Sequence, residues 1–131
     1  MQKKLLVFLI TMLIMMILAA CSGKPALSTQ EVNKLVNIQV DSDPNPPSLG
    51  DVEFVITILD AQGKPFEGAT LDIGVEHIDM TGMEMNGVAS QQSPGKYAIT
   101  ANFSMTGNWV MTVTVRKDGL EYQEDFSLKV Q

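Results

Sequence analysis

Hydrophobic and polar residues alternate along most of the chain beyond residue 35. In "DVEFVITIL" the side chains of Val52, Phe54, Ile56 and Ile58 fall on one face. The same alternation occurs in "VNIQV" (36–40), "ATLDIGVE" (69–76), "KYAITANF" (96–103), "WVMTVTVR" (109–116) and "LEYQEDFSLKV" (120–130). A period of two with many β-branched and aromatic residues predicts half-buried β-strands. A seventh short strand is expected around "MNGVASQQ" (85–92).

Turn-forming residues separate these runs. The connections are "DPNPPSLG", "DAQGKP", "SPGK" and "KDG", in which Gly63 is placed for a left-handed turn position. Six or seven strands in residues 34–131 predict an all-β domain, an immunoglobulin-like antiparallel sandwich. The disulfide usual in immunoglobulin domains is excluded, because Cys21 is the only cysteine.

The first residues have the order of an export signal. Lys3 and Lys4 precede the apolar run "LLVFLITMLIMMILAA", and "LAAC" is similar to a bacterial lipobox. We therefore expect residues 1–20 to be a lipoprotein signal peptide and residues 21–33 a tether, lipidated at Cys21. The expected location is the extracytoplasmic face of the cell membrane, where several acyl chains give stable anchoring. The alternative is an uncleaved membrane anchor, since the run is nearly long enough to span.

The charge balance argues against several classes of partner. Loss of Lys3 and Lys4 with the signal leaves seven basic residues against fifteen acidic ones, a net charge of about −8. Nucleic acids and anionic lipid surfaces require a basic face, so neither is expected as a partner. No catalytic residues are predicted either, because the chain has no free cysteine nucleophile and no Ser/His/Asp arrangement around its one histidine.

The stretch "HIDMTGMEM" (77–85) carries that histidine and three methionines. Strand parity continues the inward register of Leu71, Ile73 and Val75 to His77. The same argument on the strand that ends near Phe103 places Met105 on the core side. If the two strand ends are neighbours, His77 and Met105 converge at one rim of the sandwich. The turn-like "MTGM" brings Met80 and Met83 toward the same point, with Met85 as a weaker member.

This set of ligands suits a soft metal ion. Thioether sulfur and imidazole nitrogen favour Cu(I), whereas calcium needs several oxygen ligands and zinc needs more than one histidine in the absence of cysteine. The alternative is structural, because methionine often fills irregular cores and a histidine at a strand end often serves as a hydrogen-bonded cap. Met111, in the middle of a strand, is expected to be core.

Several segments of this chain also carry a family resemblance. They are "GDVEFVITILDAQGKP" (50–65), "GA" (68–69), "MTGM" (80–83), "GKY" (95–97) and "FSMTGNW" (103–109). The span from Gly50 to about Val115 resembles the YtkA-like domain, related to the FixH group of exported proteins. The resemblance implies copper handling or cytochrome oxidase assembly outside the membrane.

Matched position by position, the family's methionines correspond to Met80, Met83 and Met105, which the resemblance implies as copper ligands. The family's tryptophan corresponds to Trp109. The expected place of Trp109 is the core, where an indole near Cu(I) adds a cation–π contact and excludes water. The predicted function is a metallochaperone that binds Cu(I) and passes it to a cuproprotein or an oxidase subunit. The alternative is a metal-free interaction or scaffold module of a membrane complex.

Overall fold

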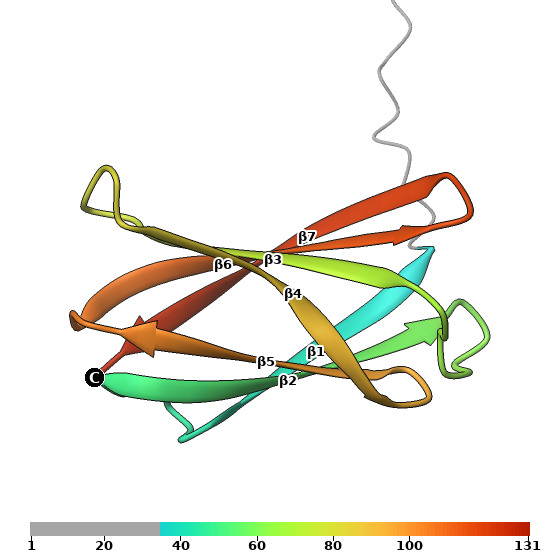
Figure 1. Cartoon of the computed structure of the whole chain (residues 1–131), viewed down its shortest axis with the longest axis horizontal. Helices are drawn as coiled ribbons and strands as arrows, with labels where there is room; N and C mark the ends of the chain where they lie inside the picture. Colours follow the sequence, from blue (N-terminus) through green and yellow to red (C-terminus); the bar gives the residue numbers. More distant parts are fainter. Residues whose placement is uncertain (1–34) are drawn as a thin grey trace, which may run out of the picture. The chain divides into compact units, whose positions relative to one another are not determined.

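A computed structural model describes residues 35–131, which form seven antiparallel strands (Figure 1). The strands are β1 (Val36–Asp43), β2 (Gly50–Asp60), β3 (Thr70–His77), β4 (Glu84–Ser93), β5 (Lys96–Phe103), β6 (Gly107–Lys117) and β7 (Leu120–Val130). Every predicted strand is present, and the seventh is β4. The expected signal peptide, the lipidated Cys21 and the tether up to residue 33 lie outside the described residues.

The strands are hydrogen-bonded in the order β1-β2-β5-β4-β3-β6-β7 and fold over into two layers. β4 joins the layers, because it pairs with β3 from Glu84 to Ala89 and with β5 only from Ser90 onward. Figure 1 shows β4 crossing obliquely from one layer to the other. The all-β sandwich is therefore confirmed.

The alternation of side chains produces the core. The inward residues of both layers are almost wholly buried, among them Phe54, Ile56, Leu71, Tyr97 and Val113. Burial of large aliphatic and aromatic side chains contributes about 1.5–3 kcal/mol each and drives the two layers together. Met111 is fully buried, as expected from its mid-strand position.

The last hairpin shows how turn chemistry fixes the register. Asp118 and Gly119 both have positive φ, 51° and 78°, and they connect the paired residues Lys117 and Leu120. Two such residues make the type I′ turn whose twist matches that of the flanking strands. The register of β6 with β7 then places Phe126 and Leu128 against the core.

The two ends of the sandwich differ in their loops. We call the end formed by loops 44–49, 78–83 and 104–106 the histidine end, because His77 pairs there with Trp109. The loops 61–69, 94–95 and 118–119 lie at the opposite end, where Thr70 pairs with Arg116. Arg116 is held there by Asp72 and Glu121, and the hydrogen bond to Glu121 and the charge of Asp72 raise its pKa.

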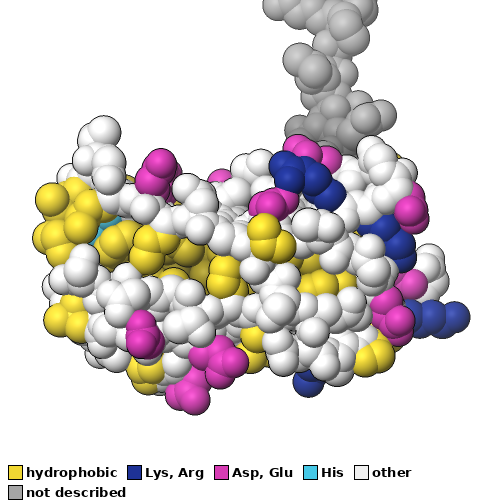
Figure 2. Space-filling view, viewed as in Figure 1, with side chains coloured by type: hydrophobic (Ala, Val, Ile, Leu, Met, Phe, Trp, Pro, Cys, Tyr) yellow, Lys and Arg dark blue, Asp and Glu magenta, His cyan; other side chains and the backbone are white. Residues whose placement is uncertain are grey.

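β4 and β5 separate toward the histidine end. β5 pairs with β4 only through Lys96 to Ala98. From Ile99 to Phe103, β5 pairs with β2 on one side, and its other edge, which faces β4, has no ladder partner within residues 35–131. Gly87 of β4 passes close to Ile99, since a Cβ on Gly87 would lie 2.8 Å from the Cδ1 atom of Ile99. Toward the histidine end a band of hydrophobic side chains is visible between the layers (Figure 2).

Residues 35–131 contain no helix that is long and apolar enough to cross a membrane.

The hydroxyl of Tyr97 provides a test of the fold. It accepts a hydrogen bond from the Ala69 amide and donates one to the Phe66 carbonyl, both at 3.3 Å, and so holds the β2–β3 loop. Because Tyr97→Phe leaves both partners unpaired, we expect it to lower the free energy of unfolding in urea by about 1–2 kcal/mol. Tyr122→Phe, at a more exposed position, is the control. Equal stability of the two variants would contradict this role.

Candidate functional site

His77 ends β3 with its side chain turned inward, as strand parity predicts. It is 8% exposed, and its ring packs edge-on against that of Trp109 at a centroid distance of 4.8 Å. Trp109 packs in turn against Phe103, at 5.1 Å, which contacts Phe54. The imidazole thus lies at the outer end of a row of aromatic rings that reaches into the core.

Both ring nitrogens of His77 have hydrogen-bond partners. The Asp79 amide, 3.2 Å from Nδ1, can only donate, so Nδ1 carries the lone pair. Nε2 therefore carries the proton and donates it to the Thr106 carbonyl at 3.3 Å. One side chain consequently connects the β3–β4 turn to the β5–β6 loop.

The β3–β4 turn folds back over the histidine. The amide of His77 donates to the Met83 carbonyl at 3.0 Å, and Gly82 takes a φ of 86°, which gives the turn the freedom expected of this glycine. Met80 and Met83 line a hollow of about 280 Å³ together with His77. Its other lining residues are Glu76, Ile78, Thr81, Gly82 and Glu84. Three of the predicted ligand residues, His77, Met80 and Met83, thus line one hollow.

The other two methionines lie elsewhere. The inward orientation expected for Met105 is wrong, because β5 ends at Phe103 and the Met105 side chain is 37% exposed in the loop. Its neighbour Thr106 contacts His77, so Met105 is at the same end but does not line the hollow. Met85 pairs with Val75 and lines a separate small cavity between β4 and β5. That position fits the packing role considered for Met85.

Trp109 occupies the predicted core position and is 2% exposed. Its indole nitrogen Nε1 is the only buried side-chain nitrogen or oxygen in residues 35–131 without a hydrogen-bond partner. Buried polar atoms of this kind are rare. Parity predicts the burial of this indole, but nothing in the sequence indicates its unsatisfied donor.

Gly107 is a residue of the site that sequence reasoning did not single out. Its φ is 129°, and a Cβ there would lie 2.7 Å from Nε2 of His77. The glycine thus makes room for the imidazole beside the β5–β6 loop. It stands in the "FSMTGNW" segment, but its role depends on a contact with a residue thirty positions earlier.

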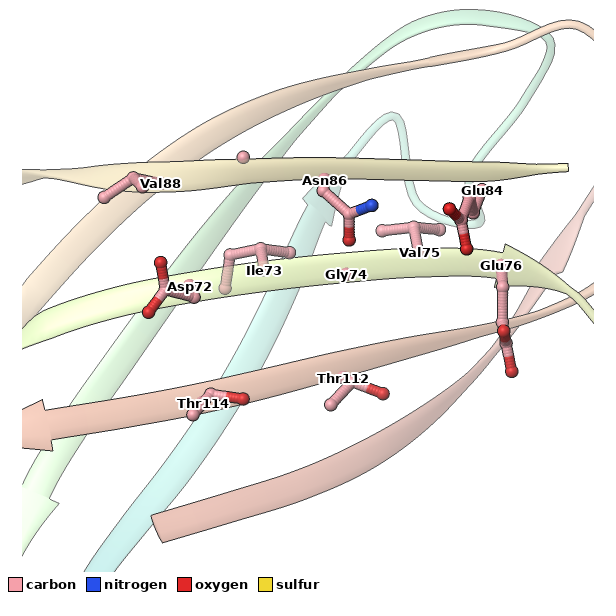
Figure 3. A pocket seen from close by; sticks show the side chains of 11 residues that line it. Asp72, Ile73, Gly74, Val75, Glu76, Glu84, Asn86, Val88, Thr112 and Thr114 are labelled. Carbon is pink, nitrogen blue, oxygen red and sulfur yellow. The ribbon is translucent and has the colours of Figure 1, made fainter. Parts of the chain in front are cut away.

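Two of the residues that line the hollow are acidic, and they also belong to the outer face of the β4-β3-β6 layer. Glu76 and Glu84 are directly opposite each other on β3 and β4. They lie at one end of a groove of about 550 Å³ that passes over Gly74 and beside Thr112 and Thr114 (Figure 3). Residues 35–131 contain no group of three or more His, Cys, Asp or Glu side chains arranged to hold a metal ion.

The family model described as YtkA-like matches residues 30–114. The chain belongs to the YtkA-like family. The match includes the whole hollow and the β5–β6 loop, so the site lies within the family domain. A comparison with curated protein sequences found no match.

Two solved structures resemble this YtkA-like domain. The PmoD soluble domain from Methylocystis sp. ATCC 49242 (Rockwell) has a TM-score of 0.51 at 18% identity, over 73% of this chain and 90% of that chain. The Escherichia coli adhesin FdeC has a TM-score of 0.51 at 24% identity, over 73% of this chain and 31% of the adhesin. At these identities the likeness shows a shared fold.

The contact between Gly107 and His77 is testable by a matched pair of variants. Gly107→Ala should lower the free energy of unfolding by about 2–4 kcal/mol, because it combines backbone strain with displacement of the ring. Gly50→Ala has similar strain, at a φ of 94°, but open space around the new methyl group, so we expect a loss of about 1 kcal/mol. Urea unfolding followed by Trp109 fluorescence measures both. Equal losses would show that His77 is not held against Gly107.

Proposed function

We propose that this YtkA-like protein is a membrane-anchored extracytoplasmic lipoprotein that binds Cu(I) through His77, Met80 and Met83 and assists copper delivery to a cuproprotein or an oxidase subunit. The role is binding, with no catalytic step. The observation that supports the proposal is the hollow that His77, Met80 and Met83 line together. Anchoring through lipidated Cys21 is part of the same proposal.

The hydrogen bonds of His77 indicate which nitrogen would take the metal. Histidine ligands usually donate their second N–H to a carbonyl or carboxylate, which fixes the ring. The Thr106 carbonyl already accepts the Nε2 proton. Nδ1 has the lone pair and faces the turn that carries Met80, so it is the proposed ligand. Copper would replace the Asp79 amide at this nitrogen.

The chemistry of the hollow favours Cu(I) as cargo. Thioether and neutral imidazole ligands carry no charge and are soft, which suits Cu(I) over harder divalent ions. Trp109, packed edge-on with the His77 ring, would exclude water from one side of the site and place an aromatic ring close to the ion. Met105 is exposed at the same end and would bind the ion transiently during its transfer to a partner.

A metal-free interaction module is the second candidate. It is favoured by the exposure of Ile78, Met80 and Met105 at the histidine end, since methionine-rich surfaces adapt readily to protein partners. The copper content of the purified protein separates the two functions.

Copper binding is tested by titrating the purified protein with Cu(I) in the presence of a competing chelator. The only tryptophan, Trp109, lies next to His77, so its fluorescence should change as copper binds. The double variant Met80→Leu/Met83→Leu should lose binding and keep its fold, because leucine replaces methionine at little packing cost. Met111→Leu makes the same change in the core and should bind normally. Identical affinities for the wild type and the double variant would exclude the site.

The proposed role of Nδ1 predicts a dependence on pH. Protons compete with copper for the imidazole lone pair, so Cu(I) affinity should fall as the solution is acidified. Nitrogen-15 NMR of labelled histidine should show the copper-induced shift at Nδ1 while Nε2 keeps its proton. An affinity that does not change on acidification would remove His77 from the ligands.

A further inference from the structure

The histidine end has an exposed apolar surface. Ile78, Met80 and Met105 are 55%, 42% and 37% exposed, and they come from the two loops that His77 connects. Figure 2 shows hydrophobic side chains gathered around the histidine at this end of the domain. We call Ile78, Met80 and Met105 the apolar tip.

Carboxylates without cationic partners flank the apolar tip. Glu76 and Glu84 face each other across the β3–β4 ladder, and Asp79 lies in the turn between them. None of the three forms an ion pair with any residue of the described domain. Like charges in directly opposite strand positions cost stability. The fold therefore carries an unneutralised acidic rim beside its exposed hydrophobic residues.

The basic side chains lie mainly at the opposite end. Of the five lysines and arginines in residues 35–131, Lys64, Lys96, Arg116 and Lys117 lie in or beside the turns far from His77. On the visible face of Figure 2 the Lys and Arg side chains are all distant from the histidine. The fifth, Lys129 on β7, pairs with Asn108 and so lies toward the histidine end, but β6 separates it from β3 and the acidic rim. Four of the five basic side chains of the described domain thus lie away from the acidic rim.

We propose that the apolar tip and its acidic rim dock a protein partner whose binding face has an apolar centre framed by lysine or arginine. Apolar contacts at the centre of such an interface supply affinity, and complementary charges at its rim supply orientation and a faster encounter. A second copy of this chain would bring two acidic rims together, and an anionic membrane would be repelled. The identity of the transferred ion rests on the proposed function. Docking at the apolar tip would place the partner over Met80 and the hollow proposed to hold Cu(I).

The docking face is tested with the full chain, metal-free, in non-ionic detergent. The probe is a synthetic amphipathic helix with methionine and leucine on one face and lysine on the other, and its twin carries glutamate in place of lysine. We expect the lysine peptide to bind and to shift the amide NMR signals of residues 76–84 and 104–106. Added salt should weaken binding, because the rim is solvent-exposed. The glutamate peptide should not bind.

Matched variants locate the charge effect. Glu76→Gln/Glu84→Gln should weaken binding of the lysine peptide by roughly threefold to tenfold, as expected for two exposed charges. Glu67→Gln/Asp118→Asn removes the same charge at the opposite end and should leave binding unchanged. Equal weakening by the two pairs, equal binding of both peptides, or shifts confined to other strands would overturn the proposal. Self-association through the apolar tip in the absence of peptide would overturn it as well.

The result is separable from copper binding. Met83→Leu leaves the apolar tip and the acidic rim unaltered, so it should bind the lysine peptide normally although it is expected to weaken Cu(I) binding. Peptide binding without copper binding would leave the docking face and exclude the copper site. Copper binding without peptide binding would support the copper site and exclude the docking face.

Discussion

The histidine end depends on the two hydrogen bonds of the His77 ring. Through Nδ1 the ring holds the amide of Asp79, and through Nε2 it holds the carbonyl of Thr106. These contacts join loops that are far apart in sequence, and edge-on packing against Trp109 supports the ring between them. One imidazole thus contacts both of the loops that carry Met80 and Met105.

The rest of the fold leaves this end open. β4 changes layers at Ala89 and Ser90, which closes the sandwich at one end and separates β4 from β5 at the other. Gly107 supplies the space that the imidazole occupies. Two features of this end lower the stability of the fold: the unsatisfied indole nitrogen of Trp109 and the opposed carboxylates of Glu76 and Glu84. Such local costs are concentrated at functional sites in many proteins.

The sequence predicts the strands well because a half-buried sheet imposes a period of two on each of them. The same parity correctly places His77 and Trp109 toward the core. It fails for Met105, because parity holds only while the strand continues and β5 ends at Phe103. The tautomer of His77, the contact with Gly107 and the opposition of Glu76 to Glu84 depend on the register between strands, which no single segment encodes. Membership in the YtkA-like family confirms the resemblance, and the copper chemistry remains the proposal.

The central claim is that one imidazole and two thioethers share a metal at the histidine end. X-ray absorption spectroscopy at the copper edge of the Cu(I)-loaded protein tests it most directly, because sulfur and nitrogen neighbours scatter differently. The account predicts a first shell of sulfur with one nitrogen, and no such shell in the Met80→Leu/Met83→Leu variant, which should not bind copper. A shell of nitrogen and oxygen alone, or one that is unchanged in that variant, would contradict it.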